Sequence, residues 1–208
     1  MSPRPYHSGK RQAAADETRQ RILAAARTLL SGASAHQVSV DAVAKAADVS
    51  RQTVYNAFGS KSGLLEALFD TLAARAGMDV QEAFAAPDAA TALTRFTEAF
   101  CRFWDSDRTV IRRLRGMAVL DRDLDRLLRE RDEMRRSALT ELLRRFTDAP
   151  EPETVDIIWQ LTGFEAYDAL AGRDTPRAHA EATRTVTAAV TVLYDAATAG
   201  GSTPRTRR

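Results

Sequence analysis

The chain has 208 residues, of which 44% are hydrophobic and 28% charged, the balance of a globular protein with a core of its own. A single cysteine excludes an intramolecular disulfide framework and cysteine-based zinc modules, and no run of ~20 apolar residues or apolar leader is present, so we expect a cytoplasmic protein. Residues 1–62 carry nine Lys/Arg and four Asp/Glu, a net charge of +5 against −3 for the remainder, which suggests that this end meets a polyanion.

The spacing of prolines and apolar residues predicts an all-α fold. Between Pro5 and Pro87 the chain has no proline, and the other prolines fall where helices would break. Apolar residues recur at helical spacing, and no period-two alternation is present. We expect helices over residues 18–30, 39–46, 50–57, 60 to about 76, 88–105, 108–119, 122–146, 152–171 and 176–198.

Two domains and two tails follow from this pattern. A short N-terminal domain is expected over residues 15–62, and the helix from residue 60 to about 76 links it to a larger helical domain over residues 77–199. The polar segments 1–14 and 200–208 contain proline or glycine and are expected to be disordered.

Residues 39–61 have the pattern of a helix-turn-helix. Two short amphipathic helices, with Ser39 and Ser50 as N-caps, share a three-residue connection. The small side chains of Ala44 and Ala47 would let the helices cross closely. The second helix of such a motif can enter the major groove of DNA. The inward positions are Val43, Ala44, Ala47, Val49 and Val54.

The outer face of the motif carries the candidate DNA-binding residues. Arg51, Gln52 and Asn56 match the hydrogen-bond patterns of base edges, and which of them reads a base is left open. For Phe58 core packing is the better interpretation, whereas Lys61 taken alone would be an ordinary surface lysine. The residues suited to phosphates are Ser39, Thr53, Tyr55 and Lys61, which with Ser50 complete the candidate set.

Residues 16–72 resemble the TetR family of transcriptional regulators. Two departures stand out: Asp48 occupies the turn position where the family usually has glycine, and Ala57 replaces a common histidine. Because Asp tolerates a left-handed conformation, the turn should survive. The matching residues are Ile22-Leu23-Ala24-Ala25-Ala26, Val43-Ala44, Ala47-x-Val49-Ser50, Thr53-Val54-Tyr55-x-x-Phe58 and Ser60-Lys61-x-x-Leu64.

The resemblance implies a ligand pocket formed by helices after residue 75. Phe96, Phe100, Phe103 and Trp104 form an aromatic stripe that could line it, although core packing is weighed ahead of ligand contact for any single residue. Arg131 falls within an apolar stripe, Leu124, Leu127, Leu128, Met134, Ala138 and Leu142. It would either reach solvent or hold an acidic ligand group. Further ligand candidates are Met117 and Trp159.

The resemblance also implies a dimer interface formed by the last two helices. The final helix has an apolar stripe, and the preceding one has apolar residues on two faces, one for its own subunit and one for a partner. Tyr167 is expected to be a packing or interface residue. The candidate interface residues are Leu161, Phe164, Val186, Val190, Leu193 and Tyr194.

These features predict a homodimeric, ligand-responsive regulator that binds operator DNA and acts as a repressor without cofactor, metal or membrane partner. In the mechanism that the resemblance implies, an effector moves the helix that starts at Ser60 and so weakens operator binding. Four alternatives stay open: an activator, oxidation sensing at Cys101, an architectural DNA-binding protein and an all-α enzyme. The histidines His7, His36 and His179 are isolated, and no catalytic motif accompanies them.

Overall fold

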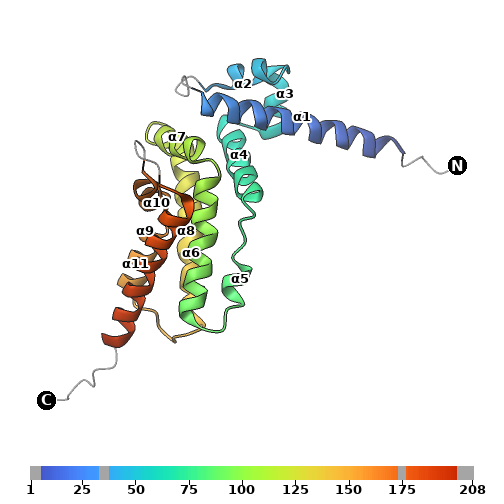
Figure 1. Cartoon of the computed structure of the whole chain (residues 1–208). Helices are drawn as coiled ribbons and strands as arrows, with labels where there is room; N and C mark the ends of the chain where they lie inside the picture. Colours follow the sequence, from blue (N-terminus) through green and yellow to red (C-terminus); the bar gives the residue numbers. More distant parts are fainter. Residues whose placement is uncertain (1–5, 33–37, 173–176, 201–208) are drawn as a thin grey trace. The chain divides into compact units, whose positions relative to one another are not determined.

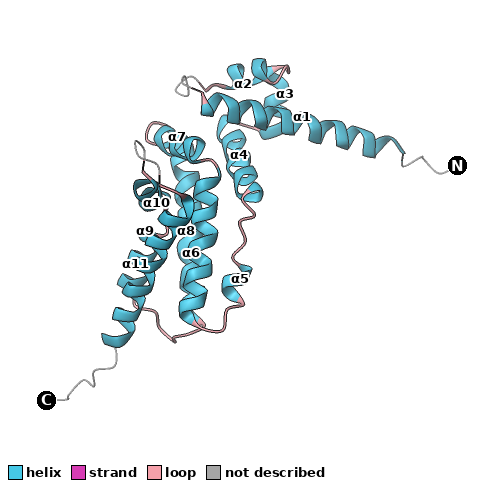
Figure 2. Ribbon diagram, viewed as in Figure 1, coloured by secondary structure: helices cyan, strands magenta, loops and turns pink. Residues whose placement is uncertain are grey.

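The computed structural model describes residues 6–32, 38–172 and 177–200, and within these ranges all regular secondary structure is helical, as predicted (Figure 2). None of the helices in these ranges is long and apolar enough to cross a membrane. In chain order, as coloured in Figure 1, the helices are α1 (Tyr6–Ser31), α2 (Val40–Ala46), α3 (Arg51–Phe58), α4 (Lys61–Arg75), α5 (Gln81–Phe84), α6 (Ala89–Ser106), α7 (Arg108–Ala118), α8 (Arg122–Arg144), α9 (Pro152–Leu161), α10 (Phe164–Ala171) and α11 (His179–Gly200).

The helices form two compact units. The first comprises Met1–Leu72 together with Thr109–Leu127, and the second comprises Ala73–Arg108 and Leu128–Arg208. The first unit therefore holds α1 to α3, most of α4 and α7, and the beginning of α8. The sequence pattern predicts residues 109–127 as part of the larger domain, whereas their contacts place them with the N-terminal helices.

The core of the first unit is formed by aliphatic side chains. Ile22 and Leu30 of α1 are fully buried, and Val43 of α2 and Val54 of α3 are buried with them. Helix α7 contributes Ile111, also fully buried. At roughly 1.5–3 kcal/mol for each large aliphatic side chain removed from water, this core is sufficient to hold short helices that would not be stable alone.

The second unit is built around α6, whose aromatic face is buried. Helix α11 packs against α6 and also contacts α9 and α10. The short helix α5 packs against α6 as well. Phe96 and Phe103 are almost completely buried on α6, and Val186 and Val190 are buried on α11. The apolar stripe of α6 is thus the centre of this unit.

Two helix boundaries differ from the expectation. Helix α1 begins at Tyr6 rather than near residue 18, so residues 6–14 are helical and not the disordered tail expected; Gln12 supports this turn with a hydrogen bond to Asp16 of 3.0 Å. The single helix expected over 152–171 is two helices, because Gly163 has extended backbone (φ −78°, ψ 164°) and is the N-cap of α10. The expected tail at 200–208 lies, apart from Gly200, outside the described residues.

Candidate nucleic-acid interface

Helices α2 and α3 form the helix-turn-helix that the sequence predicts. Val43, Ala44 and Ala47 are buried between them. In the turn, Asp48 has a φ of 52°, so the left-handed conformation expected of this residue is confirmed. The backbone N–H of Val49 donates to the carbonyl of Ala44 at 3.0 Å and closes the turn. This geometry fixes the direction in which α3 leaves α2.

Both helices are capped at their N-termini by the serines that the sequence indicates. Ser39 Oγ accepts from the N–H of Ala42 at 3.1 Å, and Ser50 Oγ accepts from the N–H of Thr53 at 3.0 Å. Ser50 Oγ also lies 2.8 Å from Thr53 Oγ1. Caps of this kind stabilise a helix by about 1 kcal/mol, so each serine has a structural role in addition to any DNA contact.

The three candidate base-reading residues, Arg51, Gln52 and Asn56, are all exposed on α3. Gln52 Nε2 donates to Asn56 Oδ1 at 2.8 Å, which leaves the amide nitrogen of Asn56 and the amide oxygen of Gln52 for other partners. Val54, on the opposite side of the helix, is buried. Helix α3 therefore anchors one face in the core and presents a polar face of donors and acceptors.

Arg51 is held by two neighbours. Its Nη1 donates to Asp41 Oδ2 of α2 at 3.1 Å, and its Nη2 donates to Tyr55 Oη at 3.2 Å. The hydrogen bond to Tyr55 and then the charge of Asp41 raise the pKa of Arg51, which stays a cation. Both members of the ion pair are about 60% exposed, so the pair is weak and open to exchange with a phosphate.

Of the remaining phosphate candidates, Tyr55 lies within α3 and Lys61 begins α4. Tyr55 is half-buried: its ring lies under the Arg51 guanidinium, 5.4 Å from it, and its hydroxyl faces the same cation. Lys61, the first residue of α4, is also half-buried, and its Nζ lies 3.5 Å from Asp121 Oδ2. Phe58 is half-buried under Arg19, whose guanidinium lies 4.2 Å from its ring centre.

Two arginines that the sequence pattern does not indicate connect helices of this unit. Arg19 of α1 donates to the carbonyl of Ala57 at 2.6 Å and so ties α1 to the end of α3. Arg113 of α7 donates to the carbonyls of Leu30 and Gly32 at the end of α1. A cation at the C-terminus of a helix satisfies its last carbonyls, a signal that becomes visible only when α7 is known to pack here.

In the second unit, the aromatic stripe of α6 is core. Phe96, Phe100, Phe103 and Trp104 are each no more than 4% exposed. The Phe96 and Phe100 rings lie 4.8 Å apart, and the Trp104 ring meets Phe164 edge-on at 5.7 Å. These contacts agree with the core packing that was weighed first for each residue.

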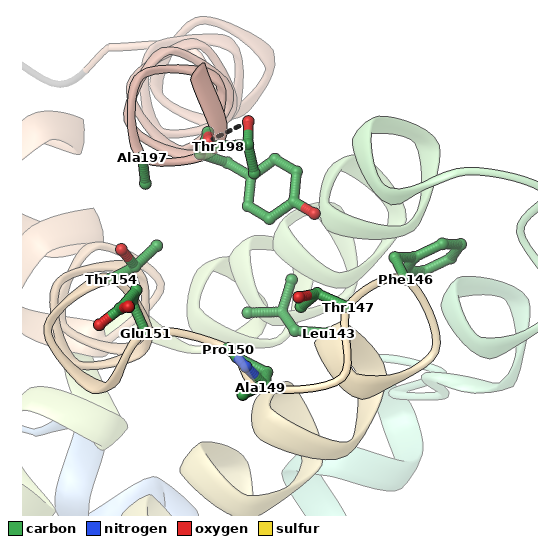
Figure 3. Close-up of a pocket in the computed structure, with 10 residues that line it drawn as sticks. Leu143, Phe146, Thr147, Ala149, Pro150, Glu151, Thr154, Ala197 and Thr198 are labelled. Carbon is green, nitrogen blue, oxygen red and sulfur yellow. Dashed lines mark hydrogen bonds between the residues drawn. The ribbon is translucent and has the colours of Figure 1, made fainter. Parts of the chain in front are cut away.

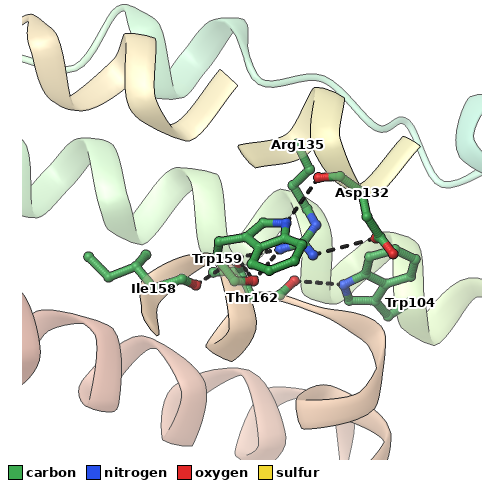
Figure 4. A network of polar contacts seen from close by, with 6 residues as sticks. All are labelled: Trp104, Asp132, Arg135, Ile158, Trp159 and Thr162. Atoms are coloured by element: carbon green, nitrogen blue, oxygen red, sulfur yellow. Dashed lines mark hydrogen bonds and ion pairs between the residues drawn. The ribbon is translucent and has the colours of Figure 1, made fainter. Parts of the chain in front are cut away.

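The buried arginine of α8 is Arg135, not Arg131. Its side chain is 5% exposed, and it donates to the carbonyl of Trp159 and, at 2.9 Å, to Thr162 Oγ1 (Figure 4). Trp104 Nε1 donates to the carbonyl of Thr162 at 2.9 Å in the same network. Arg131 is half-buried, and Met134, counted in the apolar stripe, is 55% exposed, because the buried face of α8 is rotated relative to the expected one.

The other two ligand candidates lie in different units. Trp159 is half-buried and donates from Nε1 to the carbonyl of Asp132 at 2.9 Å. Met117 is half-buried in α7, in the first unit. The structure thus brings Trp159 and Trp104 to one network with Arg135 and does not place Met117 in that unit.

A cavity of about 380 Å³ lies where the end of α8 meets the beginning of α9 and the last turns of α11 (Figure 3). Leu143 points into it, Thr154 and Glu151 stand on the α9 side, and Thr198 stands on the α11 side. Tyr194, expected at the dimer interface, lines this cavity, and burial raises the pKa of its hydroxyl.

Comparison with known proteins identifies the first unit. Residues 22–68 match the family model described as bacterial regulatory proteins, tetR family. These residues contain α2, α3, the last part of α1 and the first half of α4. Residues 22–68 therefore form a DNA-binding domain of the tetR family. Regulators of this family are DNA-binding transcription factors and not enzymes, so the match weighs against the alternative of an all-α enzyme.

Solved structures show that the TetR likeness of the fold extends along most of the chain. A TetR-family regulator from Rhodococcus sp. is 21% identical over 86% of this chain and 98% of its own, with a TM-score of 0.66. One from Syntrophomonas wolfei is 17% identical over 86% and 95%, with a TM-score of 0.68. LfrR from Mycobacterium smegmatis, solved with proflavine, is 23% identical over 86% and 96%, with a TM-score of 0.51. No curated protein matches the sequence significantly.

An apolar groove lies between α9 and α11 on the second unit. Of the residues predicted for the dimer interface, Leu161 and Leu193 line this groove, whereas Phe164, Val186 and Val190 are buried inside their own unit. The helical periodicity predicts one apolar stripe with Val186, Val190 and Leu193, whereas these residues lie on two sides of α11. The full lining of the groove is Ile157, Leu161, Ala188, Ala189, Val192, Leu193 and Ala196.

Beside α6 lies a polar cluster that the sequence pattern does not predict. Tyr167, fully buried, donates to Asp105 Oδ1 at 2.8 Å, and its hydroxyl lies 2.8 Å from His179 Nδ1. Burial and this contact with Asp105 raise the pKa of Tyr167. Cys101 is fully buried, and burial raises the pKa of its thiol to about 12, which does not favour oxidation sensing.

Proposed function

We propose that this regulator is a homodimeric cytoplasmic repressor that a small molecule releases from its operator. The observation that carries the proposal is the exposed face of α3, where Arg51, Gln52 and Asn56 stand free of the core while Val54 anchors the helix. These side chains supply the donors and acceptors that base edges require, and Ser39, Ser50, Thr53, Tyr55 and Lys61 supply phosphate contacts around them.

The apolar groove between α9 and α11 supports a dimer. Ile157 is 47% exposed and Val192 is 69% exposed, and the groove that they line is almost free of polar groups. A second copy of the same surface, related by two-fold symmetry, would cover it and form a four-helix bundle. In such a dimer the two α3 helices would enter successive major grooves, roughly 34–36 Å apart.

The second unit would hold the effector. The cavity between α8, α9 and α11 has about 380 Å³, within the range of roughly 300–1,000 Å³ that small-molecule sites occupy. The structure of LfrR with proflavine supports a small organic ligand for the relative, and by analogy for this chain.

Release requires that the effector bind the two states of the protein unequally. In the mechanism that we propose, it moves α4 and so changes the separation of the α3 helices. A hundredfold loss of operator occupancy needs about 2.7 kcal/mol of differential affinity between the DNA-competent state and the released state.

Selection of genomic fragments on the purified protein tests the proposal. We expect a small set of fragments with a two-fold symmetric sequence in each, and a neighbouring gene in each case that suggests an effector class. Metabolites of that class should then lower the affinity for the fragment by at least tenfold. Failure to retain any fragment at low ionic strength would refute DNA binding, and retention without any response to metabolites would refute effector release.

A further inference from the structure

Asp121 connects the beginning of α8 to Lys61 within the first unit. Its Oδ2 lies 3.5 Å from Lys61 Nζ, and the exposed fractions of the two side chains are 27% and 38%. Its Oδ1 accepts from the backbone N–H of Leu124 at 3.2 Å, so the same carboxylate caps α8. One oxygen of Asp121 is thus committed to the helix, and the other is left facing the lysine.

The carboxylate is held in a fixed place. The carbonyl of Asp121 accepts the N–H of Asp125 at 2.9 Å, which continues the helical pattern of α8. Helix α7, which precedes this turn, is fastened to the end of α1 by Arg113. Asp121 is therefore presented to Lys61 by an anchored turn, unlike a carboxylate at the end of a free side chain.

Lys61 has one ammonium group for two partners. It is the first residue of α4 and follows the end of α3 after only Gly59 and Ser60, so it lies at the edge of the surface proposed to meet DNA. An ammonium bound to Asp121 is partly neutralised and directed towards the α8 turn. Asp121 also places a negative charge beside the surface proposed to meet DNA.

We propose that Asp121 is a positioning residue that withholds Lys61 from the DNA backbone and so limits the affinity of the first unit for DNA. The proposal rests on the proposed function, because it assumes that this surface meets DNA.

The pair of Asp41 and Arg51 is more exposed to solvent than the pair of Asp121 and Lys61. Both of its side chains are about 60% exposed, and Arg51 has a second partner in Tyr55. Asp121 and Lys61 are more sheltered from solvent, so their mutual attraction is less screened. Asp121 is for this reason the carboxylate whose removal should change DNA binding most.

The substitution Asp121→Asn separates the charge from the cap. Asparagine caps helices as well as aspartate, so α8 keeps its hydrogen bond while the attraction to Lys61 is lost. Asp121→Ser is a second neutral variant that can still cap α8. It shows whether an effect of Asp121→Asn comes from a folding defect specific to asparagine. Asp123→Asn is the matched control, since Asp123 lies in the same turn, is 64% exposed on its side chain and pairs with Arg126 at 2.8 Å.

Binding of a labelled DNA duplex of random sequence is measured by fluorescence anisotropy over a series of salt concentrations. Asp121→Asn and Asp121→Ser should tighten binding about two- to fivefold, the factor expected of a partly exposed ion pair. The freed lysine should steepen the salt dependence of log K by about 0.9, one phosphate contact. Asp123→Asn should tighten binding clearly less than Asp121→Asn does in the same titration.

A Lys61→Gln background separates the lysine from simple charge repulsion. In this background Asp121→Asn should have no larger effect than Asp123→Asn. The inference is overturned if the wild-type chain binds duplexes and Asp121→Asn equals Asp123→Asn, or if Asp121→Asn weakens binding. If no variant binds any duplex at low salt, the proposed function itself fails together with this inference.

Discussion

Replacing Arg135 with methionine should destabilise the chain more than any other single arginine change on α8. Arg135 donates to the carbonyl of Trp159 and to Thr162 Oγ1, and Thr162 is 1% exposed, so water cannot replace the donor that the Thr162 hydroxyl loses. Each buried acceptor left unsatisfied costs about 1–3 kcal/mol. Methionine retains much of the apolar contact with the Phe100 and Trp159 rings but not the cation that lies 5.7 and 5.4 Å from them. We expect a loss of about 3–5 kcal/mol in the free energy of unfolding.

Urea unfolding at a fixed protein concentration measures this loss. Tryptophan fluorescence is a direct probe, because both tryptophans, Trp104 and Trp159, belong to the Arg135 network. Arg136→Met is the control: its side chain is 33% exposed and it pairs with Asp156 at 2.6 Å, so its loss should cost about 0.2–1 kcal/mol. If the two variants differ by less than about 1 kcal/mol, Arg135 does not hold α8 to α9 as argued.

Three other expectations follow from buried and exposed groups. With a pKa of about 12, only about one Cys101 thiol in 10⁴ is ionised at pH 8, so the folded chain should resist iodoacetamide and react once unfolded in urea; rapid labelling without denaturant would reopen oxidation sensing. Val192→Glu should convert a dimer into a monomer in sedimentation experiments, whereas Ala180→Glu, on an exposed part of α11 outside the groove, should not; an unchanged mass would reject the α9–α11 interface. Tyr55→Phe should weaken binding to all duplexes to a similar degree, and a sequence-dependent effect would reassign Tyr55 to base contact.

The helix-turn-helix could be predicted from the sequence because its signals are local. The N-caps Ser39 and Ser50, and the turn residue Asp48 with a φ of 52°, all act within four residues of their own position. Inward positions such as Val43 and Val54 follow from the helical period alone. The helix-turn-helix is predictable from the sequence because its caps, its turn and its buried positions depend on residues that are close together in the chain.

The second unit was less predictable because its details depend on contacts between distant segments. Arg131 and Arg135 are both arginines near the middle of α8, and only the position of Trp159 and Thr162 decides that Arg135 is the buried one. Similarly, Val190 and Val192 both belong to an apolar helix, yet Val190 is buried and Val192 is 69% exposed. Helical periodicity gives the faces of a helix, but the partner that covers each face comes from the tertiary structure.

The claim on which everything else depends is that the exposed face of α3 binds duplex DNA and reads its sequence. Anisotropy titrations of the wild-type chain and of the Gln52→Ala/Asn56→Ala variant, on the best selected fragment and on a scrambled duplex, test it most directly. We predict that the variant loses at least roughly 1–3 kcal/mol of discrimination between the two duplexes and that its affinity for the scrambled duplex changes less than threefold. Undiminished discrimination by the variant would contradict the account.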